Sequence, residues 1–446
     1  MSQVEEALKA AKETKALWIG SGFLSRVSEL FKEQFPEKKA VIIADNNTYK
    51  VAGKYVEQFI NSANIAQEAP FIFTDPELYA EYTYVDILTD FLKDKDVIPV
   101  AVGSGTINDL TKLSSHLTGR QYLCVATAAS MDGYTAFGAS ITANGAKQTF
   151  NCPAPQACLA DLDIISKAPS EMTASGYADL FAKIPAGADW ILADMLNVEP
   201  IDGQAWNIVQ GGLHNALSDP EGVRKGQTGS ISKLIEGLML GGFAMQWSQT
   251  SRPASGAEHQ FSHLWNMEHH LNNGEHISHG FQVSIGSIAI TAFYEQLLKT
   301  PIEKLDIEAA CNAWPTPEES DHKALDIYKG TDFPDIGLKE TRAKYIDKNQ
   351  LADQLKLLVE KWPEMKSRLE QQLVPYKEAK MRLKTVGAPV EPEEIGLSRE
   401  RLRETFIRAQ FIRRRFTVLD LAVRTNYMDR WLDGLFGKGG IWEINQ

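Results

Sequence analysis

The segment DVIPVAVGSGTINDLTK (residues 96–112) indicates the fold of the first part of the chain. It begins with an apolar, β-branched run that is typical of a buried strand, and it continues through Gly-Ser-Gly into a helical pattern. Two similar apolar runs, AVIIAD (40–45) and YLCVATAAS (122–130), lie on either side of it, with helix-like stretches between them. Strands that alternate with helices predict βαβ units and a Rossmann-like parallel sheet.

The character of the sequence changes after about residue 168. A hairpin is predicted in SITANGAKQTF (140–150), where Asn-Gly is a turn signal, and a last buried strand in ACLADLDII (157–165). Later stretches such as KLIEGLMLGGFAMQWSQ (233–249) and FQVSIGSIAITAFYEQLLK (281–299) have helical periodicity instead. We therefore expect an α/β domain over residues 1–168 and an all-α domain over residues 169–446.

Two segments of the second half have a distinct composition. Residues 313–350 are rich in proline and charge, which we interpret as an excursion or loop region. The helical pattern of residues 397–435 carries a basic stripe, RLRETFIRAQFIRRRF, which we interpret as a solvated or interface face of a helix.

Composition restricts the classes of function. The chain has 446 residues with 46 Lys and Arg against 58 Asp and Glu, a net charge of −12, which argues against a nucleic-acid partner. The four cysteines form no CxxC pair and suit a reducing compartment. We find no apolar signal region and no apolar run long enough to span a bilayer. These features predict a cytoplasmic enzyme without a membrane partner.

The glycine loop after the predicted strand could bind a nucleotide. Gly103 and Gly105 would let the backbone approach a pyrophosphate, and a helix beginning near Thr106 would offer N–H groups and a positive dipole end. The pattern lacks the third glycine of the ordinary dinucleotide fingerprint. Asp45, at the end of AVIIAD, could bind a ribose 2′-hydroxyl and favour NADH over NADPH, or it could cap a turn.

Histidines cluster in one part of the chain. Six of the nine fall within residues 259–279, and His259 and His263 are four apart, on one face of a predicted helix. His279 begins the next apolar helix. A catalytic metal ion commonly has three protein ligands, and Asp179 on an otherwise apolar helix is a candidate for the third, because an unpaired buried carboxylate is costly. We interpret the remaining histidines of the cluster as surface or cap residues: His269, His270 and His276.

Six segments, spread over most of the chain, contain the motifs of one known family. They are GSGTINDLTK (103–112), ATAASMDGYTA (126–136), ASGYADLFAK (174–183) with ADW (188–190), SRPASGAEHQFSH (251–263), HG (279–280) and RAQFIRRRFTVLDLA (408–422). Together they resemble the sn-glycerol-1-phosphate dehydrogenase family, especially its longer bacterial members. That family lies within the superfamily of iron-containing alcohol dehydrogenases and dehydroquinate synthases.

The resemblance implies that the α/β domain, residues 1–168, binds the dinucleotide and that the all-α domain, residues 169–446, binds metal and substrate. The active site is expected in the cleft between them. The resemblance also implies NADH- or NADPH-linked reduction of dihydroxyacetone phosphate, a small three-carbon phosphate, with one divalent metal ion. Zinc is favoured, with nickel or iron as alternatives, and a homodimer or larger homo-oligomer is expected. The implied roles are as follows: Gly103, Ser104, Gly105 and Thr106 hold the pyrophosphate, Asp45 the ribose, Thr127 and Ser130 the nicotinamide side, Asp132 the substrate hydroxyls, Asp179, His259 and His279 the metal, and His263 the substrate.

The sequence departs from the family at one position and leaves some points open. Ala136 stands where the family often has a serine, so this side chain offers no hydroxyl for the hydrogen bond to the cofactor that the resemblance implies. Lys147, Lys183 and Arg252 lie near the motifs and are candidates for binding the substrate phosphate, with Arg252 the first to test. The alternatives are a dehydrogenase of another small polyol or phosphorylated ketose, a dehydroquinate-synthase-like cyclase, and a non-catalytic binding protein.

Overall fold

The computed structural model describes residues 2–143 and 146–444, and contacts divide the chain into two compact units. Unit 1 consists of Met1–Leu180, Gly203–Ala254 and Thr385–Gly387. Unit 2 consists of Phe181–Asp202, Ser255–Lys384 and Ala388–Gln446. No helix among the described residues is both long enough and apolar enough to span a membrane.

Unit 1 contains the predicted parallel sheet. Its six strands, in the spatial order β1-β8-β5-β4-β2-β3, are β1 (Ala16–Gly20), β8 (Ala157–Asp161), β5 (Leu123–Ala126), β4 (Val97–Gly103), β2 (Lys39–Asp45) and β3 (Phe71–Phe73). The apolar runs at 40–45 and 96–105 are confirmed as strands, and those at 122–130 and 157–165 are confirmed over their first part. The predicted strand at 157–165 is wrong at its end, where Leu162–Ile165 form a helix, and β1 and β3 were not predicted. Both of these strands are short and lie at the edges of the sheet, where half-buried side chains give a weaker apolar signal.

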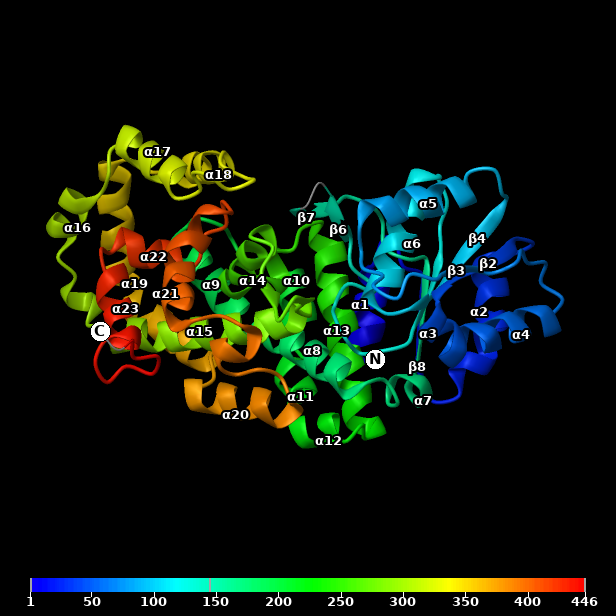
Figure 1. The fold of residues 1–446 in the computed structure, drawn as a ribbon. Helices are drawn as coiled ribbons and strands as arrows, with labels where there is room; N and C mark the ends of the chain where they lie inside the picture. Colours follow the sequence, from blue (N-terminus) through cyan, green and yellow to red (C-terminus); the bar gives the residue numbers. More distant parts are fainter. Residues whose placement is uncertain (1, 144–145, 445–446) are drawn as a thin grey trace. The chain divides into compact units, whose positions relative to one another are not determined.

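Unit 1 contains helices that cover both faces of this sheet and others that pack mainly on one another. The helices of the unit are α1 (Gln3–Ala10), α2 (Val27–Gln34), α3 (Asn46–Thr48), α4 (Lys54–Ser62), α5 (Tyr82–Leu92), α6 (Gly105–Leu117), α7 (Leu162–Ile165), α8 (Ser170–Phe181), α10 (Gly203–Gln210), α11 (Leu213–Ala216), α12 (Pro220–Arg224) and α13 (Thr228–Ser248). Figure 1 shows α2 and α4 on one side of the sheet and α5 and α6 on the other. Val27, Phe31, Val56 and Ile60 of α2 and α4 join alternate strand residues in one apolar core.

A separate hairpin follows β5 in the same unit. It consists of β6 (Ala139–Ala143) and β7 (Ala146–Phe150), which pair antiparallel as predicted. The predicted turn residues 144–145 lie outside the described part of the chain.

Unit 2 is helical, as the periodicity predicted. Its helices are α9 (Lys183–Met195), α14 (Ala257–Met267), α15 (His279–Lys299), α16 (Ile307–Ala313), α17 (Pro317–Asp326), α18 (Ile336–Lys344), α19 (Lys348–Gln372), α20 (Tyr376–Val386), α21 (Arg399–Arg408), α22 (Val418–Arg424) and α23 (Met428–Phe436). Two short strands, β9 (Leu271–Asn272) and β10 (Glu275–His276), form a hairpin between α14 and α15.

The interpretation of residues 313–350 as an excursion or loop is wrong for most of that segment, which forms α17, α18 and the start of α19. Thr316 caps α17 in a capping box with Glu319, and Pro317 occupies the first turn. Proline at the first helical position and acidic residues in the first turn are start signals for a helix. The composition that suggested a loop therefore marks where the helix begins.

The predicted domain boundary at residue 168 coincides with a change in secondary structure. The sheet ends with β8, and α7 and α8 follow it. The compact units divide the chain differently, because α10 to α13 contribute their contacts to unit 1. The functional division at residue 168 stays a prediction.

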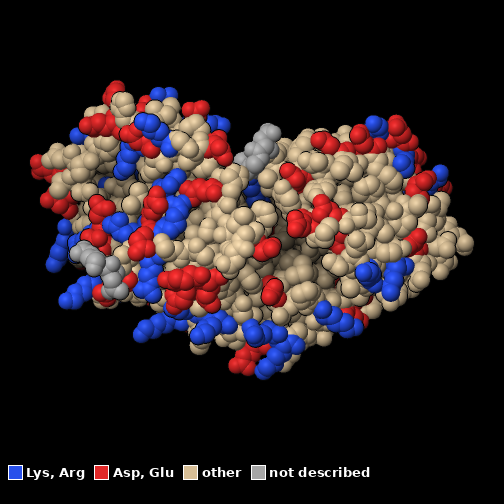
Figure 2. Space-filling view, in the orientation of Figure 1, with Lys and Arg blue, Asp and Glu red and all other residues tan. Residues whose placement is uncertain are grey.

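Charged side chains of both signs are present on the face shown in Figure 2. Lys and Arg lie among Asp and Glu in several places, and large areas carry neither. Within the basic stripe of α21, Arg401 and Arg408 form ion pairs with Glu268 and Glu404. This part of the stripe is therefore neutralised locally.

Candidate functional site

The strand order of the sheet in unit 1 reverses between β2 and β4. The chain runs outward from β2 to β3, then returns to β4 on the other side of β2 and continues to β5 and β8. Open parallel sheets bind ligands where the strand order reverses in this way. Asp45 ends β2 and Gly103 ends β4, so the two predicted nucleotide-binding segments lie on either side of the reversal.

The glycine loop leads directly into α6, which begins at Gly105, close to the predicted start. Ser104 is the N-cap residue, but its side chain makes no capping hydrogen bond. The first-turn N–H groups are thus not occupied by this hydroxyl, as an anion site requires. A Cβ atom at Gly103 would lie 2.5 Å from Cβ of Ile107, so helix packing also requires this glycine. Binding of pyrophosphate by residues 103–106 stays a prediction.

Asp45 has a structural role that the sequence left open. It is the N-cap of α3, and its Oδ1 accepts hydrogen bonds from the backbone N–H groups of Asn47 (2.7 Å) and Thr48 (2.8 Å). The cap employs one carboxylate oxygen. Contact between Asp45 and a ribose stays a prediction.

The segment after β5 carries three predicted site residues. Thr127 is buried, and its N–H donates to the carbonyl of Gly103, which joins this segment to the glycine loop. Ser130 and Asp132 are half-buried, and the carbonyl of Ser130 accepts a hydrogen bond from Ser175 Oγ at 3.3 Å. The segment is therefore tied both to the loop after β4 and to helix α8.

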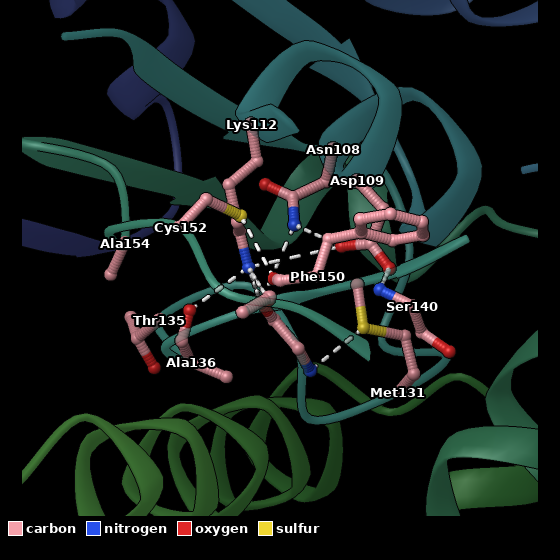
Figure 3. A network of polar contacts seen from close by, with 12 residues as sticks. Asn108, Asp109, Lys112, Met131, Thr135, Ala136, Ser140, Phe150, Cys152 and Ala154 are labelled. Atoms are coloured by element: carbon pink, nitrogen blue, oxygen red, sulfur yellow. Dashed lines mark hydrogen bonds and ion pairs between the residues drawn. The ribbon is translucent and has the colours of Figure 1, made fainter. Parts of the chain in front are cut away.

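Lys112 holds this segment against α6 (Figure 3). Its buried Nζ donates to the carbonyls of Gly133 (2.9 Å), Ala136 (2.9 Å) and Gly138 (3.0 Å), and it lies 3.8 Å from Oδ1 of Asp109. Burial raises the pKa of Asp109, although Lys112 acts in the opposite direction. The helix that starts at the glycine loop thus fixes the loop that bears Asp132.

Asp179 lies on α8 and is completely buried. Gly176, one turn earlier, allows α8 to pass so close to the carbonyl of Ala129 that a Cβ atom would lie 1.9 Å from it. This approach brings the Asp179 carboxylate to the backbone of Asp132, whose N–H donates to Oδ2 at 3.0 Å. Within unit 1, the predicted metal ligand and the predicted substrate residue are therefore neighbours.

The histidines of unit 2 are arranged as the spacing predicted. His259 and His263 lie on α14, with ring centroids 6.3 Å apart, and His279 is the first residue of α15. The His259 and His279 ring centroids are 5.2 Å apart. Exposed His269 is 3.2 Å from Asp332, and half-buried His270 is hydrogen-bonded to the carbonyl of Ile395.

The Nδ1 atoms of His259 and His279 both have hydrogen-bond partners. Nδ1 of His259 is 2.7 Å from Oε1 of Glu258, and Nδ1 of His279 is 3.2 Å from Oγ of Ser262. A histidine whose Nδ1 donates a hydrogen bond presents the lone pair of Nε2 to a ligand. The donor chemistry of unit 2 therefore fits a metal ion bound by two imidazoles.

Asp189 anchors the first turn of α14. Its Oδ2 accepts from the N–H of Ala257 (2.8 Å), and its Oδ1 accepts from Tyr294 Oη (2.6 Å) and the N–H of Val418 (2.8 Å). Burial, together with the carboxylate of Glu258, raises the pKa of Asp189 to about 7. The ADW motif thus connects the histidine helix to α15 and to the C-terminal segment.

The three basic candidates for a phosphate site lie in different environments. Lys147 is half-buried on β7, where burial lowers its pKa while Asp109 and Asp179 raise it. Lys183 at the start of α9 and Arg252 in a short 3-10 helix are buried. None of the three is linked to a ligand by these observations.

Comparisons with known proteins identify the family. A family model described as "Iron-containing alcohol dehydrogenase" matches residues 18–169. A glycerol-1-phosphate dehydrogenase (NAD(P)+) of Halalkalibacterium halodurans is 34% identical over 272 residues, which cover 60% of this chain and 68% of the relative. The chain belongs to the glycerol-1-phosphate dehydrogenase family. A member from Bacillus licheniformis is 28% identical over 425 residues, which cover 94% of this chain and 90% of that one.

Solved structures agree with the fold of this glycerol-1-phosphate dehydrogenase family member. The glycerol dehydrogenase of Schizosaccharomyces pombe has a TM-score of 0.59 at 14% identity, covering 94% of this chain and 90% of that chain. The NADH-dependent butanol dehydrogenase A of Thermotoga maritima has a TM-score of 0.57 at 14% identity, covering 93% and 96%. At such low identity these similarities support the fold alone.

Sequence reasoning gave no role to several residues that organise the site of this family member. Glu258 and Ser262 are inside the quoted motif SRPASGAEHQFSH, but only the histidines stood out as ligands. Gln282 lies three residues after His279, a spacing that places both on one helix face. Lys112 was noted in its motif without a role, because its partners are backbone carbonyls, which no side-chain pattern reveals.

Replacement of Lys112 by methionine should destabilise this family member. The substitution leaves three buried carbonyls without their donor and removes the cation beside Asp109, so the expected loss is about 3 kcal/mol or more. Denaturant unfolding, followed by tryptophan fluorescence, measures this loss. Exposed Lys93 in unit 1 is the control, and Lys93→Met should leave the transition unchanged. Equal midpoints for the two variants would contradict the role of Lys112.

Proposed function

We propose that the chain catalyses the reversible, metal-dependent reduction of dihydroxyacetone phosphate to sn-glycerol 1-phosphate with NADH or NADPH. The observation that carries this proposal is its family membership, with a relative of that activity matched over 94% of the chain. The pair of histidines in unit 2 supports the metal dependence, because Nδ1 of each ring has a hydrogen-bond partner, an arrangement that suits metal binding through Nε2.

We propose Asp179, His259 and His279 as the metal ligands. Two imidazoles and one carboxylate are a common donor set for a catalytic divalent ion, and three protein ligands leave a position for the substrate. Asp179 and His259 are buried and His279 is half-buried, as expected for residues around a site that substrate must reach. We propose zinc as the ion, with nickel or iron as alternatives.

The two bound groups would supply the reactive chemistry, since the ion would polarise the ketone as a Lewis acid and the nicotinamide would donate a hydride. The chain's own residues bind and orient. Residues 103–106 would hold the pyrophosphate at the start of α6, and Thr127 and Ser130 would line the nicotinamide side. Asp132 would accept hydrogen bonds from a substrate hydroxyl, and His263 would contact the substrate and relay a proton.

Further proposals concern cofactor preference and assembly. Asp45 would favour NADH, since a carboxylate at the ribose disfavours a 2′-phosphate. We propose a small phosphorylated three-carbon substrate, a homodimer or larger homo-oligomer, and a cytoplasmic location. Ala136 cannot provide the hydroxyl that many family members have at this position, so the cofactor is held there without that hydrogen bond.

Metal-loaded protein should consume NADH when dihydroxyacetone phosphate is added. Absorbance at the nicotinamide band measures the consumption, and a stereospecific enzymatic assay of the product identifies its configuration. We expect sn-glycerol 1-phosphate. Consumption of NADH only with other ketoses would favour a different polyol dehydrogenase. Turnover of a sugar acid phosphate without net NADH consumption would favour a cyclase.

Replacement of Asp179 by asparagine should remove the ion and the activity together, because the amide cannot supply the anionic ligand. Elemental analysis after desalting measures the retained metal. Asp132→Asn is the matched control, since it changes a proposed substrate contact in the same unit. We expect that variant to keep the ion while losing turnover. Full metal retention and activity in Asp179→Asn would overturn the ligand assignment.

A further inference from the structure

We propose that Glu258 and Ser262 are positioning residues that fix Nε2 of His259 and of His279 as the metal-binding nitrogens before the ion is bound. The inference rests on the proposed metal-dependent function. It concerns groups that surround the ligands and do not themselves touch the ion or the substrate.

The hydrogen bond of His259 determines its ring proton. Oε1 of Glu258 lies 2.7 Å from Nδ1 of His259 and also accepts the N–H of Gly256 at 2.6 Å. A carboxylate can only accept, so the proton of the neutral ring lies on Nδ1 and the lone pair on Nε2. Glu258 is completely buried, so water does not compete with His259 for this carboxylate oxygen. Carboxylate–histidine pairs of this kind orient metal ligands and raise their basicity.

The hydrogen bonds around His279 also place the ring proton on Nδ1, but the acceptor here is a hydroxyl oxygen and not a carboxylate. Ser262 donates its single hydroxyl proton to Oε1 of Gln282 at 2.7 Å. Gln282 in turn donates through Nε2 to Oδ1 of Asn266 at 3.0 Å. In this orientation of the Gln282 amide the proton of Ser262 is directed to Gln282, so the Ser262 oxygen accepts from Nδ1 of His279, 3.2 Å away. The lone pair of His279 therefore also lies on Nε2.

Helix geometry brings these groups together. His259, Ser262, His263 and Asn266 follow the i, i+3, i+4, i+7 pattern, so they occupy one face of α14. A Cβ atom at Gly286 of α15 would lie 2.5 Å from the carbonyl of Glu258, so glycine permits the close packing of the two helices.

The region around Glu258 is also closely packed. A Cβ atom at Gly256 would lie 2.5 Å from Oδ2 of Asp189 and 2.9 Å from Oε2 of Glu258. A larger residue would thus displace the acceptor of His259. Glycine at residue 256 thus leaves room for two side-chain carboxylates, whereas glycine at residue 286 leaves room for the backbone of α14.

The first test reads the ring protons directly in metal-free protein. Long-range ¹H–¹⁵N spectra of histidine-labelled protein distinguish the two neutral tautomers, and His259→Gln and His279→Gln variants assign the signals. Both rings should carry the proton on Nδ1. A ring with its proton on Nε2 at either residue would overturn the proposal for that residue.

Ser262 variants supply a second, independent readout. Ser262→Ala removes the acceptor of His279, so the ring can adopt the Nε2–H form, which cannot bind metal through Nε2. We expect about 10- to 100-fold weaker Zn²⁺ binding in competition with a chromophoric chelator. Ser262→Thr keeps the hydroxyl and should restore most of the affinity. Ser287→Ala is the matched control, because Ser287 is a buried serine of α15 whose Oγ has no hydrogen bond among the described residues.

Glu258 variants test the other histidine. Glu258→Gln keeps an acceptor of the same shape, whereas Glu258→Met keeps the volume and removes the acceptor. We expect the Nδ1–H signal of His259 to persist in the glutamine variant and to be lost or mixed in the methionine variant. If the methionine variant does not fold, the glutamine variant and the Ser262 series decide the result. Zn²⁺ affinities within two-fold of Ser287→Ala in every foldable variant would contradict the positioning role.

These measurements separate the two proposals. Correct tautomers and weakened Zn²⁺ binding in protein that does not reduce dihydroxyacetone phosphate would support the positioning role and reject the substrate assignment. Reduction of dihydroxyacetone phosphate by a Ser262→Ala variant with unchanged Zn²⁺ affinity would reject the positioning role and support the function.

Discussion

A neutral histidine can bind a metal ion only through the ring nitrogen that carries no proton, and this constraint governs the arrangement of unit 2. His259 and His279 each have Nδ1 in contact with an acceptor, provided by Glu258 and Ser262. Neighbouring residues allow these two contacts to form. Glycines at residues 256 and 286 give the backbone room, and Asp189 fixes the first turn of α14. The packing around the two proposed ligands therefore holds Nδ1 of each ring against a hydrogen-bond partner.

In unit 1, the cationic side chain of Lys112 holds the segment that bears Asp132. The segment that bears Asp132 has no regular secondary structure of its own, so its carbonyls need donors. Lys112 provides three hydrogen bonds from α6, the helix that begins at the glycine loop. The backbone of Asp132 then contacts the carboxylate of Asp179. The proposed cofactor, substrate and metal residues of this unit are thus connected through a few buried polar contacts.

Much of the fold could be predicted because the spacing of apolar residues along the sequence differs between strands and helices. The central strands are continuous apolar runs, and the four-residue spacing of His259 and His263 correctly placed both on one helix face. The start of α17 was misread, since proline and charge mark the first turn of a helix as well as a loop. The edge strand β1 was missed because only its first residue is fully buried.

The polar contacts of the site could not be predicted from the sequence, because they depend on the three-dimensional arrangement of the side chains. Glu258 and Ser262 are visible in their motif, but their role depends on hydrogen-bond directions that only a folded helix pair defines. The capping role of Asp45 likewise follows from the φ and ψ angles of the turn after β2. Sequence patterns thus located the ligand candidates, while the groups that orient them required the packed structure.

X-ray absorption spectroscopy of zinc-loaded protein tests the proposed metal centre most directly. We predict a first shell of nitrogen and oxygen at about 2.0–2.1 Å, outer-shell scattering from two imidazole rings, and no sulfur at about 2.3 Å. A sulfur ligand, or scattering from fewer than two imidazoles, would contradict the assignment of His259 and His279 as the histidine ligands.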